Sequence, residues 1–373
     1  MRIGIMLRSI DEKGGVGVYT RNIVQELLQI DRKNEYMLFY ANPANIGTFA
    51  HHEKVTERWV RDSNKAIWDQ IAIPRACRRE QVDVLFHPKF TAPLLAPCPV
   101  VMTVHGADWF MPDQAIYYPP LDVLYMRIAM PLYLKKCQMV ISVTQSTTDD
   151  FNQALRLEPN KLQTVYFAPA RHFQRVRDPE VLRMVRARYQ LPDRFILTLT
   201  KRQGDGRKNL GQVLKSYALY HNSTNNPSKL VIGGRDCHLF RAEYGLPDDG
   251  LGRDVLFPGW IEQTDLPAVY SMADLYFYPS NLESASIPVM EALACGTPII
   301  TSNVNGLQEI AGDAALLVNP RDTIAIAAAL CQILSEPALR QTLSERGLIR
   351  AQRYNWDECA AQTLAIIEAA ARA

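Results

Sequence analysis

Short apolar runs recur along the chain, and each is followed by a polar or glycine-containing turn and then by helical periodicity. The first run is Arg2–Leu7. A glycine turn follows it, and from Val18 to Leu28 the apolar positions recur at the spacing of a helix. Apolar runs separated by helices are typical of the buried parallel strands of an α/β fold. Further strands are predicted at 36–40, 82–86, 100–104 and 139–143.

The pattern changes between Ala168 and Asp193, where three prolines and several arginines occur without an apolar run. We interpret this segment as a connection between domains. The pattern then restarts with a strand at 195–200 and a helix at 209–220. A restarted series predicts two similar doubly wound domains rather than one long sheet. Further strands are predicted at 229–232, 255–257, 275–278 and 298–301, and an alanine-rich helix at 356–371.

The composition narrows the class of protein. The chain has 373 residues, of which 47% are hydrophobic and 21% charged, so it is long enough for two cores. A net charge of +2 gives no electrostatic case for nucleic-acid binding. The start of the chain lacks the apolar core of a signal peptide, and no run of about 18 apolar residues suggests a membrane span. Seven scattered cysteines without a Cys-x-x-Cys pair favour reduced thiols in a cytoplasmic protein.

The segment 279–298 contains residues typical of a loop followed by a helix start and a helix end. Ser286 is predicted to cap the helix, and Pro288 suits its first turn. Gly296 is predicted to end it. These signals predict that Glu283 lies in the loop and that Glu291 lies about one turn inside the helix.

Both carboxylates are expected near the carboxyl end of a parallel sheet, where such folds bind ligands. Carboxylates accept hydrogen bonds from sugar hydroxyls, and a helix N-terminus suits a diphosphate. The spacing of Glu283 and Glu291 taken alone is weak evidence, and it favours the simpler interpretation that each acidic residue lies near a helix start because the helix dipole stabilises it there.

The longer motif carries a resemblance. Glu283, seven residues, Glu291 and then Ala292-Leu-Ala-Cys-Gly-Thr-Pro298 resemble the signature of the retaining glycosyltransferases of glycosyltransferase family 4, also called glycosyl transferases group 1. The resemblance implies the GT-B fold, in which two Rossmann-like α/β domains face each other across a cleft. Residues 1–170 would form the acceptor-side domain, with a C-terminal helix at about 355–373 packed back on it. Residues 171–354 would form the nucleotide-sugar donor domain.

The resemblance also implies roles for the motif residues. The first glutamate, Glu283, would hold the hydroxyls of the donor sugar, and Glu291 would hold the ribose. The family usually has Gly-Phe-Gly after the first glutamate, whereas this chain has Ser284-Ala285-Ser286. Serines still present backbone N–H groups but add bulk near the sugar. The predicted donor contacts in this segment are Glu283, Ser284, Ala285, Ser286, Ile287 and Glu291.

A basic loop at 200–209 follows the first strand of the second domain. On its own it reads as a solvated turn, but family members carry an arginine and a lysine here that face the diphosphate. Arg202 and Lys208 are the predicted pair, with Lys201 and Arg207 as alternates. Cations aimed at the diphosphate would stabilise the charge that develops on cleavage. The chain has no Asp-x-Asp triplet, which fits transfer without a metal or other cofactor.

Three positions in the first domain also match the family. Gly15 and Gly17 lie in the first strand-to-helix turn, where the family's glycines face the donor phosphates, although a glycine turn is often only a tight turn. His105 follows the strand 100–104, and in the family a histidine here lies under the reacting sugar and can donate a hydrogen bond. The catalytic set is therefore predicted as His105, Arg202, Lys208 and Glu283. Asp108 and His87 are weaker candidates, the latter for acceptor contact.

Other second-domain landmarks lie at strand ends. The backbone at Gly234 and the loop at Trp260 and Ile261 are predicted to flank the base. Arg235 either reaches the donor or is exposed. The segment 303–309 matches a family loop and is interpreted as structural.

The function implied by the resemblance is retaining, metal-independent transfer of a hexose from a UDP- or GDP-sugar to a hydroxyl of a glycan or lipid-linked acceptor in polysaccharide biosynthesis. Two alternatives remain open: a GT-B epimerase or phosphorylase, and a nucleotide-sugar-binding protein without catalytic activity. A dinucleotide-dependent dehydrogenase is disfavoured because the first glycine loop lacks the dinucleotide pattern.

Two segments, Trp59–Arg79 and Tyr117–Lys136, mix aromatic, apolar and basic residues. The favoured interpretation is amphipathic helices packed on the core of the first domain. The alternative is peripheral contact with the inner face of a membrane, as for relatives that act on lipid-linked acceptors.

Overall fold

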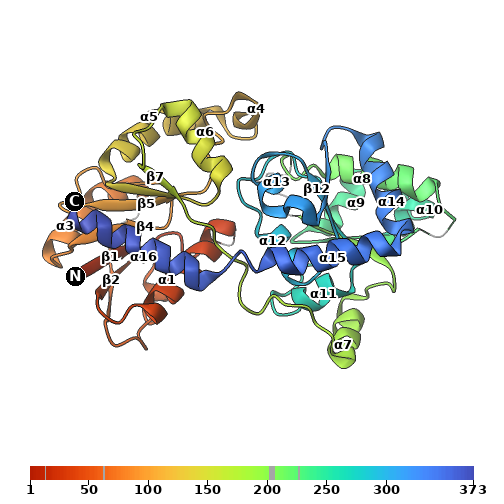
Figure 1. Ribbon diagram of the computed structural model, residues 1–373, viewed down its shortest axis with the longest axis horizontal. Helices are drawn as coiled ribbons and strands as arrows, with labels where there is room; N and C mark the ends of the chain where they lie inside the picture. Colours follow the sequence, from red (N-terminus) through yellow and green to blue (C-terminus); the bar gives the residue numbers. More distant parts are fainter. Residues whose placement is uncertain (13, 62–63, 201–205, 226) are drawn as a thin grey trace. The chain divides into compact units, whose positions relative to one another are not determined.

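A computed structural model describes residues 1–12, 14–61, 64–200, 206–225 and 227–373 (Figure 1). The chain divides into two compact units. Unit 1 comprises Met1–Ala168 and Asn355–Ala373, and unit 2 comprises Pro169–Tyr354. Each unit is a parallel sheet covered by helices, so the prediction of two doubly wound α/β domains is confirmed.

Unit 1 contains a seven-stranded sheet of order β3-β2-β1-β4-β5-β6-β7 in which all neighbouring strands are parallel. The strand order reverses between β1 and β4, and ligands bind at such switch points in open α/β sheets. The strands are β1 (Arg2–Met6), β2 (Glu35–Tyr40), β3 (Val55–Trp59), β4 (Val84–His87), β5 (Val100–Val104), β6 (Met139–Ser142) and β7 (Leu162–Thr164).

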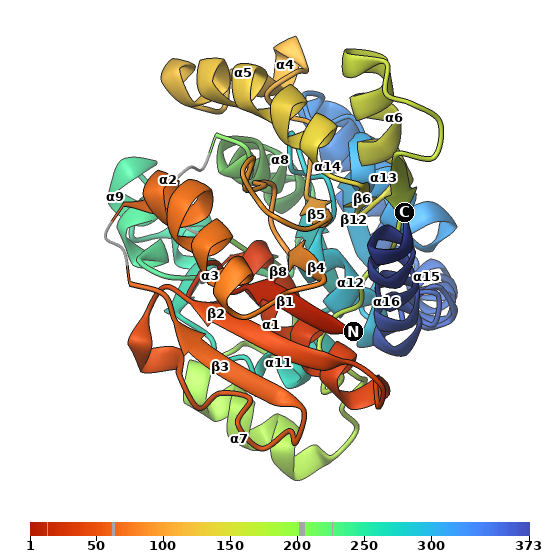
Figure 2. The ribbon, with the colours of Figure 1, turned by 90° about the vertical axis from the view of Figure 1, so that its left-hand side faces the viewer.

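Two layers of helices cover the unit 1 sheet. On one face, α16 (Trp356–Arg372) packs against α1 (Gly15–Ile30) and against β4, β5 and β6. On the other face, side chains of η2 (Trp68–Ala72), α3 (Ile73–Arg79), α5 (Pro120–Lys136) and α6 (Gln145–Leu155) share one apolar core with the strands. In Figure 2, α5 and the short α2 (Lys65–Ile67) lie away from α16. The remaining short helices are η1 (Pro43–Asn45) and α4 (Pro112–Ala115).

Unit 2 contains a six-stranded parallel sheet of order β10-β9-β8-β11-β12-β13, which reverses between β8 and β11. Its strands are β8 (Phe195–Leu199), β9 (Lys229–Gly233), β10 (Val255–Gly259), β11 (Leu275–Tyr278), β12 (Ile299–Ser302) and β13 (Leu316–Val318). Its longer helices are α7 (Pro179–Tyr189), α8 (Leu210–Asn222), α12 (Ile287–Ala294), α14 (Thr323–Ser335) and α15 (Pro337–Ala351). The others are η3 (Cys237–Leu239), α9 (Phe240–Glu243), α10 (Gly250–Arg253), α11 (Leu266–Met272), α13 (Asn305–Ala311) and η4 (Gly312–Ala314).

Sequence reasoning missed several elements. The edge strand β3 and the three-residue β7 were not predicted. The helix α7 lies inside the segment interpreted as a connection between domains, where no helix was predicted, and its Pro179 occupies the first helical turn, where proline is tolerated. The segment 303–309 is not only a loop, since α13 begins at Asn305. Among the described residues no single helix is long and apolar enough to span a membrane, and only the pair Thr323–Ser335 with Pro337–Arg372, bent by 96°, meets that test jointly.

Candidate active site

The centre of the candidate site is the loop between β11 and α12 in unit 2. Ser286 occupies the N-cap position and Pro288 the first turn of α12, as predicted. The Ser286 side chain makes no cap hydrogen bond, however, and its buried hydroxyl has no partner among the described residues. Gly296 follows the helix at a positive φ of +68°, which ends the helix as expected for glycine. The loop therefore presents an uncapped helix N-terminus.

Glu283 and Lys208 form an ion pair at this loop. The Lys208 ammonium donates to Oε1 of Glu283 and to the hydroxyl of Tyr278, the last residue of β11. Tyr278 in turn donates to Oε1 of Glu283 at 2.7 Å, and the ammonium lies 4.8 Å from the centre of the tyrosine ring. The resemblance assigns Glu283 to the sugar and Lys208 to the phosphate, and the structure brings these two residues together although they are 75 positions apart.

The charge of Glu283 is retained despite burial. Burial acts to raise the pKa of this carboxyl, but the charges of Lys208 and Arg207 and the hydrogen bonds from Lys208 and Tyr278 outweigh it, so the pKa is lowered from 4.5. The site therefore holds an ionised carboxylate that is only 8% exposed. A buried charge of this kind is stable only when it is paired.

Glu291 has the opposite electrostatic character. It lies inside α12 with 5% of its surface exposed, and burial raises its pKa to about 8 while a hydrogen bond from Tyr270 at 3.1 Å partly opposes the rise. At neutral pH Glu291 is therefore mainly protonated. The two glutamates of the motif have pKa values displaced in opposite directions, a feature that is common at functional sites.

Three buried tyrosines connect the glutamates. Tyr276 and Tyr278 point to the same face of β11 because side chains alternate along a strand, and their rings lie 5.6 Å apart and nearly parallel. Tyr276 also meets Tyr270 edge-on at 5.3 Å. The Tyr276 hydroxyl has no hydrogen-bond partner among the described residues. Sequence reasoning did not identify these tyrosines, although the alternation in Leu275-Tyr-Phe-Tyr278 indicated two aromatic side chains on one face.

The basic loop is fixed to the same segment. Asn209, at the start of α8, has a left-handed backbone (φ +61°) and donates to the carbonyls of Pro279 and Pro320 at 2.9 and 2.8 Å. Asparagine tolerates this conformation better than most residues. The carbonyl of Arg207 accepts from the backbone N–H of Asn281 at 2.8 Å. These contacts hold Lys208 against Glu283.

Of the other three predicted cations of this loop, only Arg207 lies within the described residues. Arg202 and its alternate Lys201 lie outside the described residues, so their predicted contact with the diphosphate stays a prediction. The alternate Arg207 is described, and its charge is among those that lower the pKa of Glu283.

Gly306 supports the loop from behind. Its backbone N–H donates to the carbonyl of Glu283 at 3.1 Å. A Cβ at this position would lie 1.7 Å from the carbonyl oxygen of Ser284, so only glycine allows the approach. Sequence reasoning treated this region as a structural loop, and the Asn-Gly pair at the start of α13 was the available signal.

In unit 1, the glycine turn leads directly into α1. Gly15 is the first residue of the helix and is exposed. Gly17 is buried, and a Cβ there would lie 1.8 Å from the carbonyl oxygen of Glu12. This contact is sufficient to explain the glycine at position 17. Donor contact by Gly15 and Gly17 stays a prediction.

His105 lies at the carboxyl end of β5, as predicted. Its Nε2 lies 3.0 Å from the carbonyl oxygen of Pro88, and because a carbonyl only accepts, Nε2 carries the proton and donates. Burial lowers the pKa of His105 to about 4. The ring is therefore neutral at pH 7, and its Nδ1 can accept a hydrogen bond but not donate one. In this arrangement the Nε2 proton is used by Pro88, and contact of His105 with the sugar stays a prediction.

The two weaker unit 1 candidates are also buried. Asp108 accepts a hydrogen bond from Tyr118. His87 is fully buried, its Nδ1 lies 2.7 Å from the carbonyl of Thr91, and burial lowers its pKa to about 4. The prediction that His87 contacts an acceptor is wrong for this structure, because the ring does not reach the surface.

The residues predicted to flank the base lie at the ends of β9 and β10. Arg235 is exposed and its guanidinium lies 5.7 Å from the centre of the Trp260 ring. Ile261 is buried, with 3% of its surface exposed. An exposed tryptophan with a cation over its ring is available for stacking, and base contact stays a prediction.

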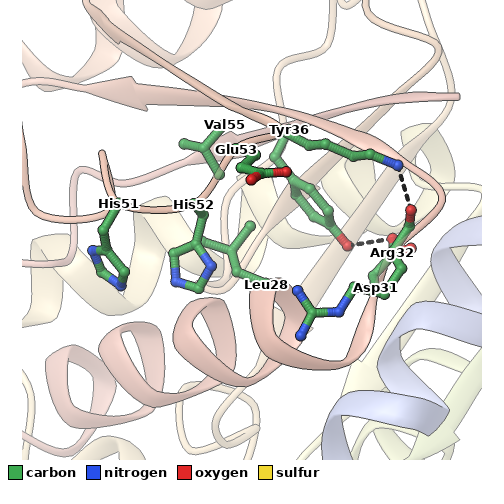
Figure 3. Close-up of a pocket in the computed structure, with 9 residues that line it drawn as sticks. Leu28, Asp31, Arg32, Tyr36, His51, His52, Glu53 and Val55 are labelled. Carbon is green, nitrogen blue, oxygen red and sulfur yellow. Dashed lines mark hydrogen bonds between the residues drawn. The ribbon is translucent and has the colours of Figure 1, made fainter.

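A cavity of about 310 Å³ occurs in unit 1. It lies where β2 and β3 begin, and Figure 3 shows His51, His52, Arg32 and Tyr36 around it. Doubly wound sheets bind ligands at the carboxyl ends of their strands, whereas this cavity is at the amino ends. It therefore does not compete with the site at Glu283.

Metal ligands do not cluster in the described part of the chain: no group of three or more His, Cys, Asp and Glu residues there has geometry suited to a metal ion.

Comparisons with known proteins identify the families and relatives that the chain resembles. Residues 184–350 match the family model of glycosyl transferases group 1, and residues 13–167 match that of glycosyltransferase family 4. The chain is similar to the O-antigen chain mannosyltransferase B of Escherichia coli, with 27% identity over 77% of this chain and 74% of that protein. It is also similar to the serotype-specific mannosyltransferase WbdA of Escherichia coli, with 24% identity over 60% of this chain, and the match spans only 28% of that longer protein.

Solved structures share the fold. HepE of Anabaena in complex with UDP-glucose superimposes with a TM-score of 0.76 at 17% identity, over 99% of this chain and all of that one.

Proposed function

The chain belongs to the GT-B glycosyltransferases of glycosyltransferase family 4, and from that premise we propose that it moves a hexose from a UDP- or GDP-sugar to a hydroxyl of a glycan or lipid-linked acceptor, with retention at the anomeric carbon. The observation that supports the proposal most is the buried Lys208–Glu283 pair at the carboxyl end of β11, beside a second buried carboxyl at Glu291. A polar cluster of this kind is costly to bury, and the chemistry of a nucleotide sugar accounts for each of its parts.

In this proposal Glu283 and Lys208 bind the sugar and the adjoining phosphate of the donor, where the reaction takes place. A buried, ionised carboxylate accepts hydrogen bonds from sugar hydroxyls. The lysine places a positive charge where the sugar–phosphate bond breaks. The Lys208–Glu283 pair fixes both side chains, and donor hydroxyls and phosphate oxygens replace part of this pair on binding.

The N-terminus of α12 carries the diphosphate. The first N–H groups of a helix have no partner within the helix, and the hydroxyl of Ser286, which has no partner in the part of the chain that the structure describes, lies at the same place. Both are donors suited to phosphate oxygens. Ser284, Ala285 and Ile287 contribute the loop backbone around it, and Glu291, one turn further, accepts from the ribose hydroxyls.

The proposed step needs no metal and no other cofactor. The acceptor hydroxyl oxygen forms the new bond to the anomeric carbon on the side from which the nucleoside diphosphate departs. The old carbon–oxygen bond breaks, its electron pair remains on the diphosphate, and the proton of the acceptor passes to a phosphate oxygen. Lys208, together with the predicted Arg202, compensates the charge left on the phosphate.

The mannosyltransferases to which the chain is similar favour mannose as the sugar and an O-antigen-type glycan as the acceptor. The structural neighbour HepE is in complex with UDP-glucose, which supports keeping a uridine donor in the proposal. The proposal therefore includes both UDP- and GDP-sugars as donors, and GDP-mannose is the first donor to test.

The test has two stages. Thermal shifts with GDP-mannose, UDP-glucose and ADP-glucose identify the donor, and Glu291→Ala or Lys208→Ala should abolish the shift. Transfer to a mannan-type acceptor is then followed by NMR of the anomeric proton in the product, with EDTA present and absent. Inversion of the anomeric centre, or full loss of activity in EDTA, would contradict the proposed mechanism.

A binding protein without catalytic activity is the second candidate, because Ser284-Ala285-Ser286 replaces the family's glycines in the sugar-contacting loop. Clear nucleotide binding with neither transfer nor hydrolysis of the donor would favour this candidate. Phosphate-dependent glycan cleavage, or epimerisation of the donor without acceptor, would instead favour a phosphorylase or an epimerase.

A further inference from the structure

The cavity at the amino ends of β2 and β3 has a lining that no part of the proposed reaction uses. Its volume is about 310 Å³, and its walls come from the end of α1, the segment between α1 and β2, and the turn before β3. Clefts of about 300 Å³ and more are the usual size of small-molecule sites. The chemistry of its lining therefore indicates which class of ligand it would take.

His52 lines this cavity with a ring nitrogen that the chain does not use. Its Nε2 is buried and has no hydrogen-bond partner among the described residues. Two turn hydrogen bonds fix its backbone: its N–H donates to the carbonyl of Phe49 at 3.1 Å, and its carbonyl accepts from Val55 at 3.2 Å. The ring packs against that of His51, with the centres 4.2 Å apart. Because a buried polar atom without a partner is costly, this nitrogen is suited to a hydrogen-bonding group of a ligand.

Arg32 contributes hydrogen-bond donors to the same cavity. Its guanidinium extends toward Leu28 and the His52 ring (Figure 3). Its backbone is held separately, since its carbonyl accepts a hydrogen bond from the Lys54 ammonium. Burial and the charges of His51 and Arg32 lower the pKa of His52 from 6.5, so the His52 ring is uncharged at neutral pH.

The formal charges of the side chains around the cavity cancel. Arg32 and Lys54 are balanced by Asp31 and Glu53. The carboxylate of Asp31 already accepts hydrogen bonds from residues of the turn that follows it, whereas Glu53 is exposed. A lining with donors, an acceptor and no net charge favours a neutral polar ligand over an anion or a cation.

We propose that this cavity binds a neutral sugar unit of a glycan at a site that takes no part in the transfer reaction. A sugar hydroxyl both donates and accepts hydrogen bonds, so it matches either tautomer of His52, the N–H groups of Arg32 and the carboxylate of Glu53. Leu28 and Val55 supply an apolar surface for the C–H face of the sugar ring.

The position of the cavity separates this binding from catalysis. Doubly wound sheets bind the ligands of their reactions at the carboxyl ends of the strands, and this cavity lies at the amino ends of β2 and β3. It would therefore hold a glycan chain without acting on it. The inference goes beyond the proposed function, and its binding test does not require the chain to be active.

The test is titration of the full chain by saturation-transfer difference NMR, with mannobiose and maltose as neutral probes and mannose 6-phosphate as a charged one. We expect at least one neutral disaccharide to bind. His52→Phe keeps an aromatic ring and removes both nitrogens, and it should weaken this binding about tenfold. Arg32→Ala should weaken it by a similar factor. Lys33→Ala should bind as the unaltered chain does, because Lys33 is also exposed but does not line the cavity.

Binding of neither disaccharide would overturn the inference, and so would affinities that His52→Phe and Arg32→Ala leave unchanged. Tighter binding of mannose 6-phosphate that Arg32→Ala abolishes would also overturn it, because the cavity would then be an anion site. Arg32→Ala should leave kcat and KM for a disaccharide acceptor unchanged, and a change in either would place Arg32 at the acceptor site instead. Disaccharide binding that depends on Arg32, in a chain without transfer activity, would count against the proposed function and not against this site.

Discussion

Tyr278 donates its hydroxyl to Oε1 of Glu283 at 2.7 Å, while Tyr276, two residues earlier on the same strand and equally buried, has no partner for its hydroxyl among the described residues. The two rings stack at 5.6 Å. Removing one oxygen from each tyrosine therefore gives two variants that match in size and burial and differ in the hydrogen bonds that the Tyr278 hydroxyl makes with Glu283 and Lys208.

Tyr278→Phe should lower kcat about tenfold to a hundredfold, because a hydrogen bond to a charged group contributes about 1.5–3 kcal/mol and here it orients both Glu283 and Lys208. The lost bond is one of those that lower the pKa of Glu283. The carboxylate will therefore be protonated at a higher pH, and the acid limb of the pH–rate profile should move upward.

Tyr276→Phe is the control and should leave both kcat and the acid limb unchanged, since its hydroxyl bonds to nothing among the described residues. Equal profiles for the two variants would contradict the positioning role of Tyr278. A loss of melting temperature shared by both would report only packing.

The effects of substituting Lys208 and Glu283 on the free energy of unfolding should not be additive, whereas either substitution should abolish donor binding. Lys208→Met leaves a buried carboxylate without its ion partner and should cost about 3–5 kcal/mol of unfolding free energy. Adding Glu283→Gln removes the unpaired charge, so the double variant should regain most of that stability. Donor binding should remain lost, because neither the cation nor the carboxylate is restored.

The measurement is a double-mutant cycle on unfolding free energy, run beside donor titrations of the same four proteins. A double variant that regains donor affinity together with stability would show that the pair is structural. A double variant as unstable as Lys208→Met would show that the two side chains act independently.

The sequence predicted the β–α series, both sheets and the positions of Glu283 and Glu291 relative to α12. Buried parallel strands are continuous apolar runs, and these are the strongest local signal. The edge strand β3 was not predicted because it is half exposed and carries charged residues, in the sequence Val55-Thr-Glu-Arg-Trp59. Glycine also predicted a helix end correctly where its effect is local, as at Gly296, which follows the last turn of α12 at a positive φ.

The contacts of the site were not predictable in the same way. The pairing of Lys208 with Glu283 joins residues on two different strand–helix units, and no local pattern specifies it. Ser286 occupies the predicted cap position, yet its hydroxyl does not bond to the helix. The contact of the His105 Nε2 with the carbonyl of Pro88 joins two separate strand ends, and no local pattern specifies it either.

Gly306→Ala should disturb the loop of Glu283 without damaging unit 2 as a whole. The new Cβ would lie 1.7 Å from the Ser284 carbonyl oxygen, so the loop must move, and we expect donor affinity to fall at least about tenfold. The measurement is donor titration by calorimetry. Gly211→Ala in α8 is the control, since the nearest atom to its Cβ is 3.8 Å away and alanine favours helix. Unchanged affinity in Gly306→Ala would contradict the supporting role of this glycine.

Glu291 should make the protein less stable as the pH rises. Its pKa is raised from 4.5 to about 8 in the folded chain, so the folded state holds a proton that the unfolded state has released between these values. Stability from this group is complete below about pH 4.5 and declines up to about pH 8. Glu291→Gln removes the decline, so its advantage in melting temperature over the unaltered chain should be near zero at pH 5 and largest at pH 8. An advantage independent of pH would contradict the raised pKa.

The same proton should be released when the donor binds. Ribose hydroxyls that donate to Glu291 stabilise the carboxylate form and lower the pKa of this group from about 8. Donor affinity should therefore rise with pH from about 6 to about 8 and level off above that range, because beyond it the free protein is already deprotonated. Calorimetry in buffers of different ionisation enthalpy measures the released proton directly. Glu291→Gln should bind more weakly, release no proton at this site and show an affinity that is flat over the same range. Proton uptake on binding, or an unchanged pH dependence in Glu291→Gln, would place the ribose elsewhere.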